Sequence, residues 1–250
     1  MPRALRPEHA GGWRRPVSAY HPLRPWVGGL LEEAVLIQHI KSIRTSGTIL
    51  PASGFLVRSL AECVDFAHAR NIVELGAGTG CVTRELLRRM RPDARLLSLE
   101  INPAFIAACQ GAIRDPRLTL RQACATTLPE VLEQEGMDGA DAVVSGLPLS
   151  IMDDDVVDRI LDVSHASLRP LGRFVQYQYS LSNQPRMTQR YGDVDVGFTL
   201  LNVPPAFVFS CSGRPAGGLG RVSRVRAPLG SLYAAALAAV AMAVRTYQQF

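Results

Sequence analysis

The feature that most constrains the fold is a short apolar run that leads through a glycine-rich turn into a helical pattern. Residues 71–75 (NIVEL) have the length of a buried strand, residues 76–80 (GAGTG) contain three glycines, and residues 83–90 (TRELLRRM) repeat apolar side chains at helical spacing. A strand that passes through a glycine turn into a helix is the βα unit of nucleotide-binding folds. The sequence therefore predicts a parallel sheet.

Strand and helix patterns continue to alternate as far as residue 180. Strand-like runs occur at residues 94–100, 117–123, 141–147 and 172–180, and helical patterns at residues 103–113, 129–134 and 153–168. Residues 195–203 and 206–212 then indicate two strands joined across Pro204 and Pro205. We expect a Rossmann-like α/β fold with a seven-stranded, mostly parallel sheet, a closing β-hairpin and helices on both faces.

Four regions follow from composition. Residues 1–28, rich in Pro, Arg and Gly, are expected to form a flexible arm. Residues 29–69 are expected to hold N-terminal helices, and the amphipathic pattern at residues 30–44 fits docking on a membrane as well as packing on the core. Residues 70–212 are the expected catalytic domain, and residues 213–250 a basic, Ala-rich C-terminal extension. The uncharged run at residues 229–244 is shorter than the roughly 20 residues that span a bilayer.

The net charge of +5 is unevenly distributed along the chain. Residues 1–45 carry seven basic and three acidic side chains, and residues 214–250 carry five and none, so the two ends hold +4 and +5 and the middle −4. Basic ends on an acidic body suit an anionic lipid surface better than a broad nucleic-acid groove. Solvated Arg-rich termini without a partner explain the pattern equally well.

A cofactor site is indicated by the glycine turn together with two acidic residues. Gly76, Gly78 and Gly80 allow a ligand to approach the backbone closely, and Glu100 ends the next strand, where a carboxylate can accept hydrogen bonds from both ribose hydroxyls. Glu74 would oppose a phosphate but suits the cationic sulfonium and amino group of S-adenosylmethionine. The turn resembles motif I of class I methyltransferases, and this resemblance implies S-adenosylmethionine as the cofactor.

Three further segments narrow the resemblance. Residues 145–149 (SGLPL), 174–180 (FVQYQYS) and 202–208 (NVPPAFV), with SGTILPASGFL before the domain, resemble bacterial phospholipid N-methyltransferases across residues 30–212. Related rRNA adenine dimethylases share this architecture. The resemblance implies methylation of the amine of phosphatidylethanolamine by a cytoplasmic enzyme, with peripheral attachment to the inner face of the plasma membrane as a further expectation. Nucleic acid is the less favoured partner, and the oligomeric state is left open.

Two departures from these families leave alternatives open. The dimethylases carry an Asn-Leu-Pro-Tyr type motif, whereas this chain has Ser145 and Leu149 at the outer positions, so the stacking surface for a base, worth about 1–3 kcal/mol, is absent. Cys124 stands where an acidic residue would contact the adenine amino group, and a thiol is a weak acceptor. An RNA adenine N6-methyltransferase and a non-catalytic methyltransferase-fold binding protein therefore remain as alternatives.

The candidate catalytic residues lie at strand ends, where doubly wound sheets bind ligands. They are Ser145, Tyr177 and Tyr179, with Asp153 as an electrostatic partner for a cationic substrate. The two tyrosines share one face of their strand and can form an aromatic wall for a methylated ammonium, or simply pack on a helix. His165 is expected to be structural, and no metal is expected because neither the five cysteines nor the five histidines have metal-ligand spacing.

Overall fold

The computed structural model describes residues 52–202, 204–213 and 221–226, the last of these by their backbone alone. The predicted arm, residues 1–28, and the candidate docking helix, residues 30–44, lie outside these ranges. So does most of the predicted extension at residues 213–250. None of the helices described is both long enough and apolar enough to cross a bilayer.

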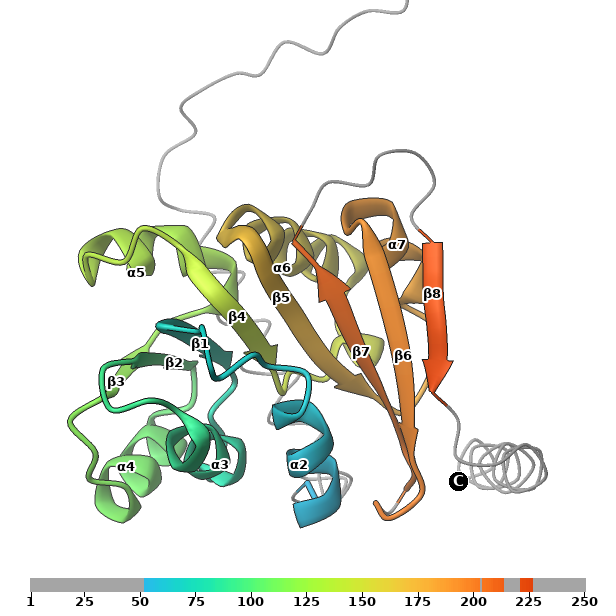
Figure 1. The fold of residues 1–250 in the computed structure, drawn as a ribbon. Helices are drawn as coiled ribbons and strands as arrows, with labels where there is room; N and C mark the ends of the chain where they lie inside the picture. Colours follow the sequence, from blue (N-terminus) through green and yellow to red (C-terminus); the bar gives the residue numbers. More distant parts are fainter. Residues whose placement is uncertain (1–51, 203, 214–220, 227–250) are drawn as a thin grey trace, which may run out of the picture.

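The described chain folds into a mixed sheet with the strand order β3-β2-β1-β4-β5-β7-β6-β8 (Figure 1). The strands are β1 (Asn71–Leu75), β2 (Arg95–Glu100), β3 (Leu118–Gln122), β4 (Ala140–Ser145), β5 (Leu168–Gln178), β6 (Asp193–Thr199), β7 (Ala206–Ser212) and β8 (Arg221–Arg226). The first five are mutually parallel, and β7 runs antiparallel to β5 and β6. The predicted α/β fold with its closing hairpin is confirmed.

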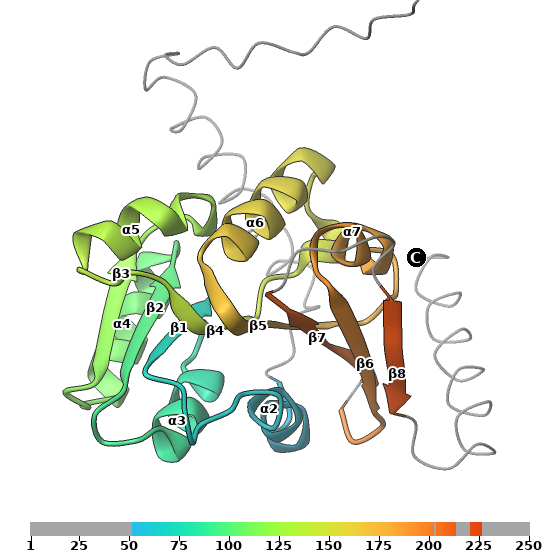
Figure 2. The ribbon, with the colours of Figure 1, turned by 45° about the horizontal axis from the view of Figure 1, so that its top comes forward.

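Helices cover both faces of this sheet (Figure 2). The helices α2 (Gly54–Ala61) and α3 (Cys81–Arg89) lie on one face, and α5 (Leu128–Gln134), α6 (Asp154–Ala166) and α7 (Gln184–Arg190) on the other. The helix α4 (Pro103–Ala112) packs against β2 and β3. Short 3-10 turns, η1 (Ala125–Thr127) and η2 (Leu149–Ile151), follow β3 and β4.

Two elements are present that the sequence analysis did not anticipate. The helix α7 occupies part of the segment after residue 180 where the alternation was expected to stop. The strand β8 pairs in parallel with β6 and adds an eighth strand within the region assigned to the C-terminal extension. Of the N-terminal helices expected within residues 29–69, the described part of the chain contains α2, which ends at Ala61.

Local sequence explains where the helices near the site begin. Ser53 caps α2, its hydroxyl accepting a hydrogen bond from Leu56 N at 3.2 Å. Asn102 caps α4 in the same way, accepting from Ala104 N at 2.9 Å, and Pro103 occupies the first helical turn. Both caps lie at the carboxyl-end edge of the sheet, so they fix the helix starts that surround the site.

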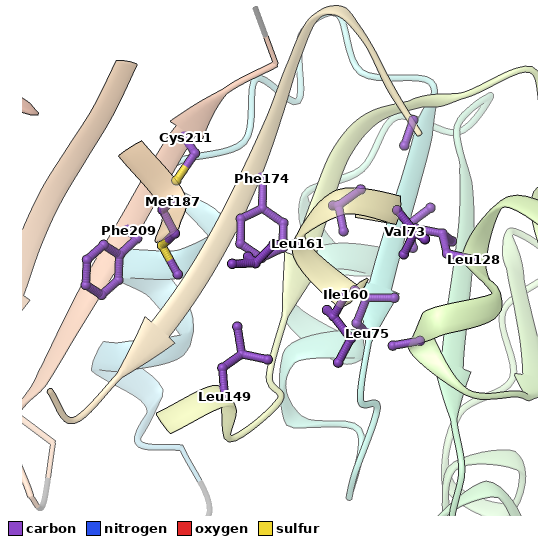
Figure 3. Close-up of a cluster of buried hydrophobic side chains, with 14 of the residues drawn as sticks. Val73, Leu75, Leu128, Leu149, Ile160, Leu161, Phe174, Met187, Phe209 and Cys211 are labelled. Atoms are coloured by element: carbon purple, nitrogen blue, oxygen red, sulfur yellow. The ribbon is translucent and has the colours of Figure 1, made fainter. Parts of the chain in front are cut away.

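The core consists of two apolar clusters, one on each face of the sheet. The cluster beneath α5, α6 and α7 is shown in Figure 3 and includes Val73, Leu75, Leu128, Leu149, Ile160, Leu161, Phe174, Met187, Phe209 and Cys211. The cluster beneath α2 and α3 includes Leu56, Leu60, Ile72, Leu86, Leu96 and Val144. Since alternate residues of β1, β2, β4, β5 and β7 enter opposite clusters, this part of the sheet is buried on both sides and its strand ends are held in fixed register.

Candidate active site

The candidate site lies where β1 and β4 adjoin, at their carboxyl ends. The chain orders its strands outward from β1 to β3 and then crosses to β4 and β5, which places a topological switch point between β1 and β4. Gly146 N donates to Leu75 O at 2.8 Å, and a Cβ on Gly146 would lie only 3.2 Å from Gly76 O. The turns after the two strands are therefore in backbone contact, and glycine at position 146 allows that approach without displacing Gly76.

The three glycines of the turn adopt a backbone conformation that favours glycine. Gly76, Gly78 and Gly80 have φ values of 82°, 52° and 79°, in the left-handed region that other residues rarely adopt. A Cβ on Gly80 would lie 2.8 Å from Ile113 Cδ1, whereas one on Gly78 would meet nothing within 4 Å. The turn is thus packed against the end of α4 at Gly80 and open at Gly78, where a ligand can reach its backbone.

Glu100 connects the glycine turn to the next loop. Its Oε2 accepts from Gly78 N at 2.9 Å, and its Oε1 accepts from Asn102 N at 2.9 Å. Each oxygen keeps a second lone pair, so the carboxylate can still accept the two hydroxyls of a ribose. From α4, Cys109 Sγ donates to Gly78 O at 3.3 Å, which holds the same residue from its carbonyl side.

Glu74 is placed beneath the glycine turn rather than in the open. Its Oε2 accepts from Thr83 Oγ1 at 2.7 Å and from Ser98 Oγ at 2.6 Å, while Oε1 is buried without a partner among the described residues. Burial raises the pKa of Glu74 to about 7, opposed by the two hydroxyl hydrogen bonds and assisted by the nearby Glu100 charge. A bound cation would stabilise the ionised carboxylate.

Cys124 lies just beyond β3, as the sequence placed it. Its thiol is buried and accepts a hydrogen bond from Thr126 Oγ1 at 3.1 Å. The end of β3 is joined to β2, because Ala123 N donates to Glu100 O at 3.2 Å. Cys124 therefore follows the backbone contact between the end of β3 and the ribose-binding candidate Glu100, and its thiol offers only a weak acceptor.

Ser145, the first of the candidate catalytic residues, ends β4 with a fully buried side chain. Its hydroxyl accepts from Leu147 N at 3.3 Å and so turns the chain at SGLPL. Gln176, its register partner on β5, donates from Nε2 to Leu147 O at 2.9 Å. The Gln176 Oε1 is buried without a partner among the described residues. In this arrangement, Ser145 and Gln176 shape the loop after β4.

Tyr177 and Tyr179 lie together on the α2 and α3 face of the sheet. Their ring centroids are 5.9 Å apart in an edge-to-face arrangement. Burial raises the pKa of Tyr177 to about 12, and burial also raises the pKa of Tyr179, against a hydrogen bond with Asn202 that lowers it. Both phenols therefore stay protonated near neutral pH and can donate hydrogen bonds or present their rings to a cation, but they cannot act as bases.

The two remaining residues considered in the sequence, Asp153 and His165, lie near opposite ends of α6. Asp153 is exposed at the start of α6, after η2. His165 lies near the other end of α6, edge-on to Tyr191 with centroids 5.1 Å apart, consistent with the structural role expected for it. No group of three or more His, Cys, Asp or Glu side chains within the described part of the chain is arranged to hold a metal ion.

Sequence reasoning missed several residues that build the site. Ser98 could have been found, because it is the one polar residue inside the apolar run of the second strand. Asn202 belongs to a segment that carried the resemblance, but its role was not foreseen: Oδ1 accepts from Ser53 N at 3.0 Å and Nδ2 donates to Pro204 O at 2.7 Å. Cys109 left no signal, since its contact with Gly78 depends on how α4 packs.

The fold and the cofactor site together define a class of protein, and comparison with known proteins agrees. A family model described as a methyltransferase domain matches residues 72–172. The chain is similar to the O-methyltransferase TomG from Streptomyces achromogenes, solved with S-adenosylmethionine, with a TM-score of 0.53 and 16% identity over 71% of this chain and 88% of that one. That likeness concerns the fold alone.

A more specific relative is the ornithine lipid N-methyltransferase of Singulisphaera acidiphila. It is 30% identical over 172 residues, covering 66% of this chain and 88% of the relative. A ribosomal RNA small subunit methyltransferase H from Thiobacillus denitrificans is 37% identical, but over only 31% of this chain and 25% of its own length. The chain belongs to the class I S-adenosylmethionine-dependent methyltransferases.

Proposed function

We propose that this methyltransferase transfers the methyl group of S-adenosylmethionine to the primary amine of a membrane-lipid head group, with phosphatidylethanolamine as the leading substrate. The observation that carries the proposed substrate class, a lipid amine, is the likeness to ornithine lipid N-methyltransferase across 88% of that protein's length. Within that class, the resemblance of residues 145–149, 174–180 and 202–208 to phospholipid N-methyltransferases favours phosphatidylethanolamine. Ornithine lipid is therefore the second candidate substrate. Both lipids present a primary amine on a short alkyl chain, so the same nucleophile would attack the methyl group with either substrate.

The cofactor side of the site is supplied by the glycine turn, Glu100, Glu74 and the segment at Cys124. Glu100 would hold the ribose, and Glu74 would favour the positive charges of the cofactor from beneath Gly76 and Gly78. When bound, S-adenosylmethionine supplies an electrophilic methyl group. The protein's task is then to align the amine with that group and to exclude water.

The substrate amine must reach the site without its proton. A primary amine has a pKa near that of lysine, about 10.4, so it arrives mainly as an ammonium ion. Tyr177 and Tyr179 could hold that ion against their rings, and desolvation beside them would favour the neutral form. Asp153, exposed near the end of β4, would attract the ammonium before it enters. Proton release goes to solvent, since both phenols stay protonated.

Two alternatives are less well supported. For an RNA adenine substrate, Leu149 would have to replace the aromatic stacking residue, and its side chain is buried in the core with 1% exposure. The main argument for a non-catalytic binding protein is that Cys124 replaces the acidic residue that would contact the adenine amino group. Against it, Gly78 is held on both sides, its N–H donating to Glu100 and its carbonyl accepting from Cys109, so the turn is ordered for a ligand.

The direct test is methyl transfer from radiolabelled S-adenosylmethionine with vesicles containing phosphatidylethanolamine or ornithine lipid, and total RNA in a parallel reaction. Chromatography of the lipid phase should reveal methylated phosphatidylethanolamine. Label only in ornithine lipid would replace the leading substrate by the second. Label in RNA, or no label despite measurable cofactor binding, would refute the proposal. Glu133→Gln, on the exposed side of α5, serves as a neutral control for variants of Glu100.

A further inference from the structure

Large apolar side chains of the described chain are exposed at five positions, and four of them lie at the edge of the sheet that holds the candidate site. These four, which we call the apolar rim, are Phe55, Ile151, Leu181 and Leu201. They come from four separate segments: the start of α2, the turn η2, the loop after β5 and the turn between β6 and β7. The fifth, Leu171, lies near the amino end of β5.

Strand pairing brings three of these four segments, those after β4, β5 and β6, to one edge. The strands β4 and β5 are parallel, so the residues after them leave the sheet side by side. Because β7 is antiparallel to both β5 and β6, β6 runs in the same sense as β5 and its carboxyl end is at the same edge. The arrowheads of β4, β5 and β6 accordingly point the same way in Figure 1.

The start of α2 is tied to this edge by hydrogen bonds. Ser53 Oγ donates to Leu201 O at 2.8 Å, and Ser53 N donates to Asn202 Oδ1 at 3.0 Å. Phe55 follows two residues later in the first turn of α2, so its backbone begins at the same edge of the sheet as Leu201. The rim therefore extends from η2 past the end of β5 to the β6–β7 turn and α2, around the tyrosines Tyr177 and Tyr179.

We infer that the apolar rim docks on the surface of a bilayer that displays amine head groups, so that the mouth of the site faces the lipid. This inference rests on the proposed function and specifies how its substrate is reached. Single exposed apolar residues are common on protein surfaces, but here four converge on the edge where a membrane-anchored substrate must enter. Separate apolar residues on four loops suit a fluid interface, which adapts to their spacing.

The charges beside the rim fit an ammonium-bearing surface. Asp153, Asp154 and Asp155 are exposed directly after η2, next to Ile151, and Asp154 pairs with Arg186. The Asp153 and Asp155 carboxylates at this position attract ammonium head groups and repel a phosphate backbone, whereas the Asp154 charge is balanced by Arg186. An RNA surface is therefore disfavoured as the occupant of this edge.

The test uses the full chain and the double variant Ile151→Gln with Leu201→Gln, with Leu171→Gln as the matched control on the opposite edge. Binding is measured by co-sedimentation with uncharged vesicles of phosphatidylcholine and phosphatidylethanolamine, which removes the contribution of the basic termini to anionic lipid. We expect the rim variant to lose at least about tenfold in vesicle binding, because two apolar side chains no longer leave water. The control should bind as the wild type does.

Methyl transfer to a short-chain phosphatidylethanolamine, dispersed as single molecules, separates docking from catalysis. The rim variant should keep this activity and its melting temperature while losing methylation of vesicle lipid. Unchanged vesicle binding by the rim variant, or an equal loss in Leu171→Gln, would overturn the docking surface even if the dispersed lipid is methylated. Rim-dependent vesicle binding by a protein that methylates neither form of lipid would support the surface and refute the proposed function.

Discussion

At the scale of single residues, Glu100 connects two loops of the candidate cofactor site. One oxygen accepts from Gly78 N and the other from Asn102 N, so replacing the carboxylate by an amide places an NH2 group against one N–H donor. We expect Glu100→Gln to lower the affinity for S-adenosylmethionine by about 10- to 100-fold, equivalent to a lost charged hydrogen bond of about 1.5–3 kcal/mol. Calorimetric titration measures this, and unchanged affinity would exclude Glu100 from the cofactor site.

Glu74 should affect stability and cofactor binding in opposite directions. Its pKa is about 7 in the folded chain against an ordinary value of 4.5, so between these pH values only the folded state keeps the proton. The free energy of unfolding therefore falls as pH rises from 4.5 to 7, by up to about 3 kcal/mol, and stays low above that range. Glu74→Gln removes this loss while keeping an oxygen for Thr83 and Ser98.

At pH 8 without cofactor, Glu74→Gln should consequently melt at a higher temperature than the wild type, yet bind S-adenosylmethionine more weakly. Wild-type affinity should also increase as pH rises through about 7, because the ionised carboxylate favours the cationic cofactor. Thermal melts and titrations across this pH range provide both readouts. If Glu74→Gln melts at a lower temperature than the wild type at pH 8, the ionised Glu74 carboxylate stabilises the folded state, and burial does not make it unfavourable.

At the scale of elements, the start of α2 is connected to the β6–β7 turn through Ser53. Its hydroxyl caps α2 and also donates to Leu201 O at 2.8 Å. Ser53→Ala removes both contacts, so we expect a loss of about 1–2 kcal/mol in the free energy of unfolding. Ser59→Ala, in the middle of α2, is the control and should change stability by less than about 0.5 kcal/mol. Denaturant titration distinguishes them, and equal effects would remove the special role of Ser53.

The elements that the sequence predicted well are those whose pattern is local. The strand β1, its glycine turn and α3 could be identified because length, burial and turn chemistry all agree. The helix α7 could not, because its seven residues (QPRMTQR) bury only Met187 and it is held largely through ion pairs from Arg186 and Arg190 to α6. The strand β8 depends on the free edge of β6, which is a property of the folded sheet.

At the scale of the whole molecule, the candidate site also combines features that follow from local sequence with features that depend on the folded sheet. Sequence order places Ser145, Tyr177 and Tyr179 at strand ends, and the structure keeps them there. The order of residues in the sequence does not reveal that Ser145 is fully buried while the two tyrosines pack against the cluster beneath α2 and α3. Nor does it reveal that Glu74 is buried beneath the glycine turn. Those facts depend on the order of strands across the sheet, which fixes which faces the helices cover.

Cofactor binding should therefore stabilise the whole domain, because the loops that form its site leave β1, β2 and β3 and contact the turn after β4. A ligand that binds only the folded state at 100 times its dissociation constant adds about 2.7 kcal/mol to the free energy of unfolding. For a domain of this size we expect S-adenosylmethionine to raise the melting temperature by about 5–10 °C. Glu100→Gln, with an affinity about 10- to 100-fold weaker, should lose about half or more of this rise at the same concentration, whereas Glu133→Gln should keep it. A rise that survives Glu100→Gln would mean that the cofactor is held elsewhere, since Glu100 connects the glycine turn after β1 to the loop after β2.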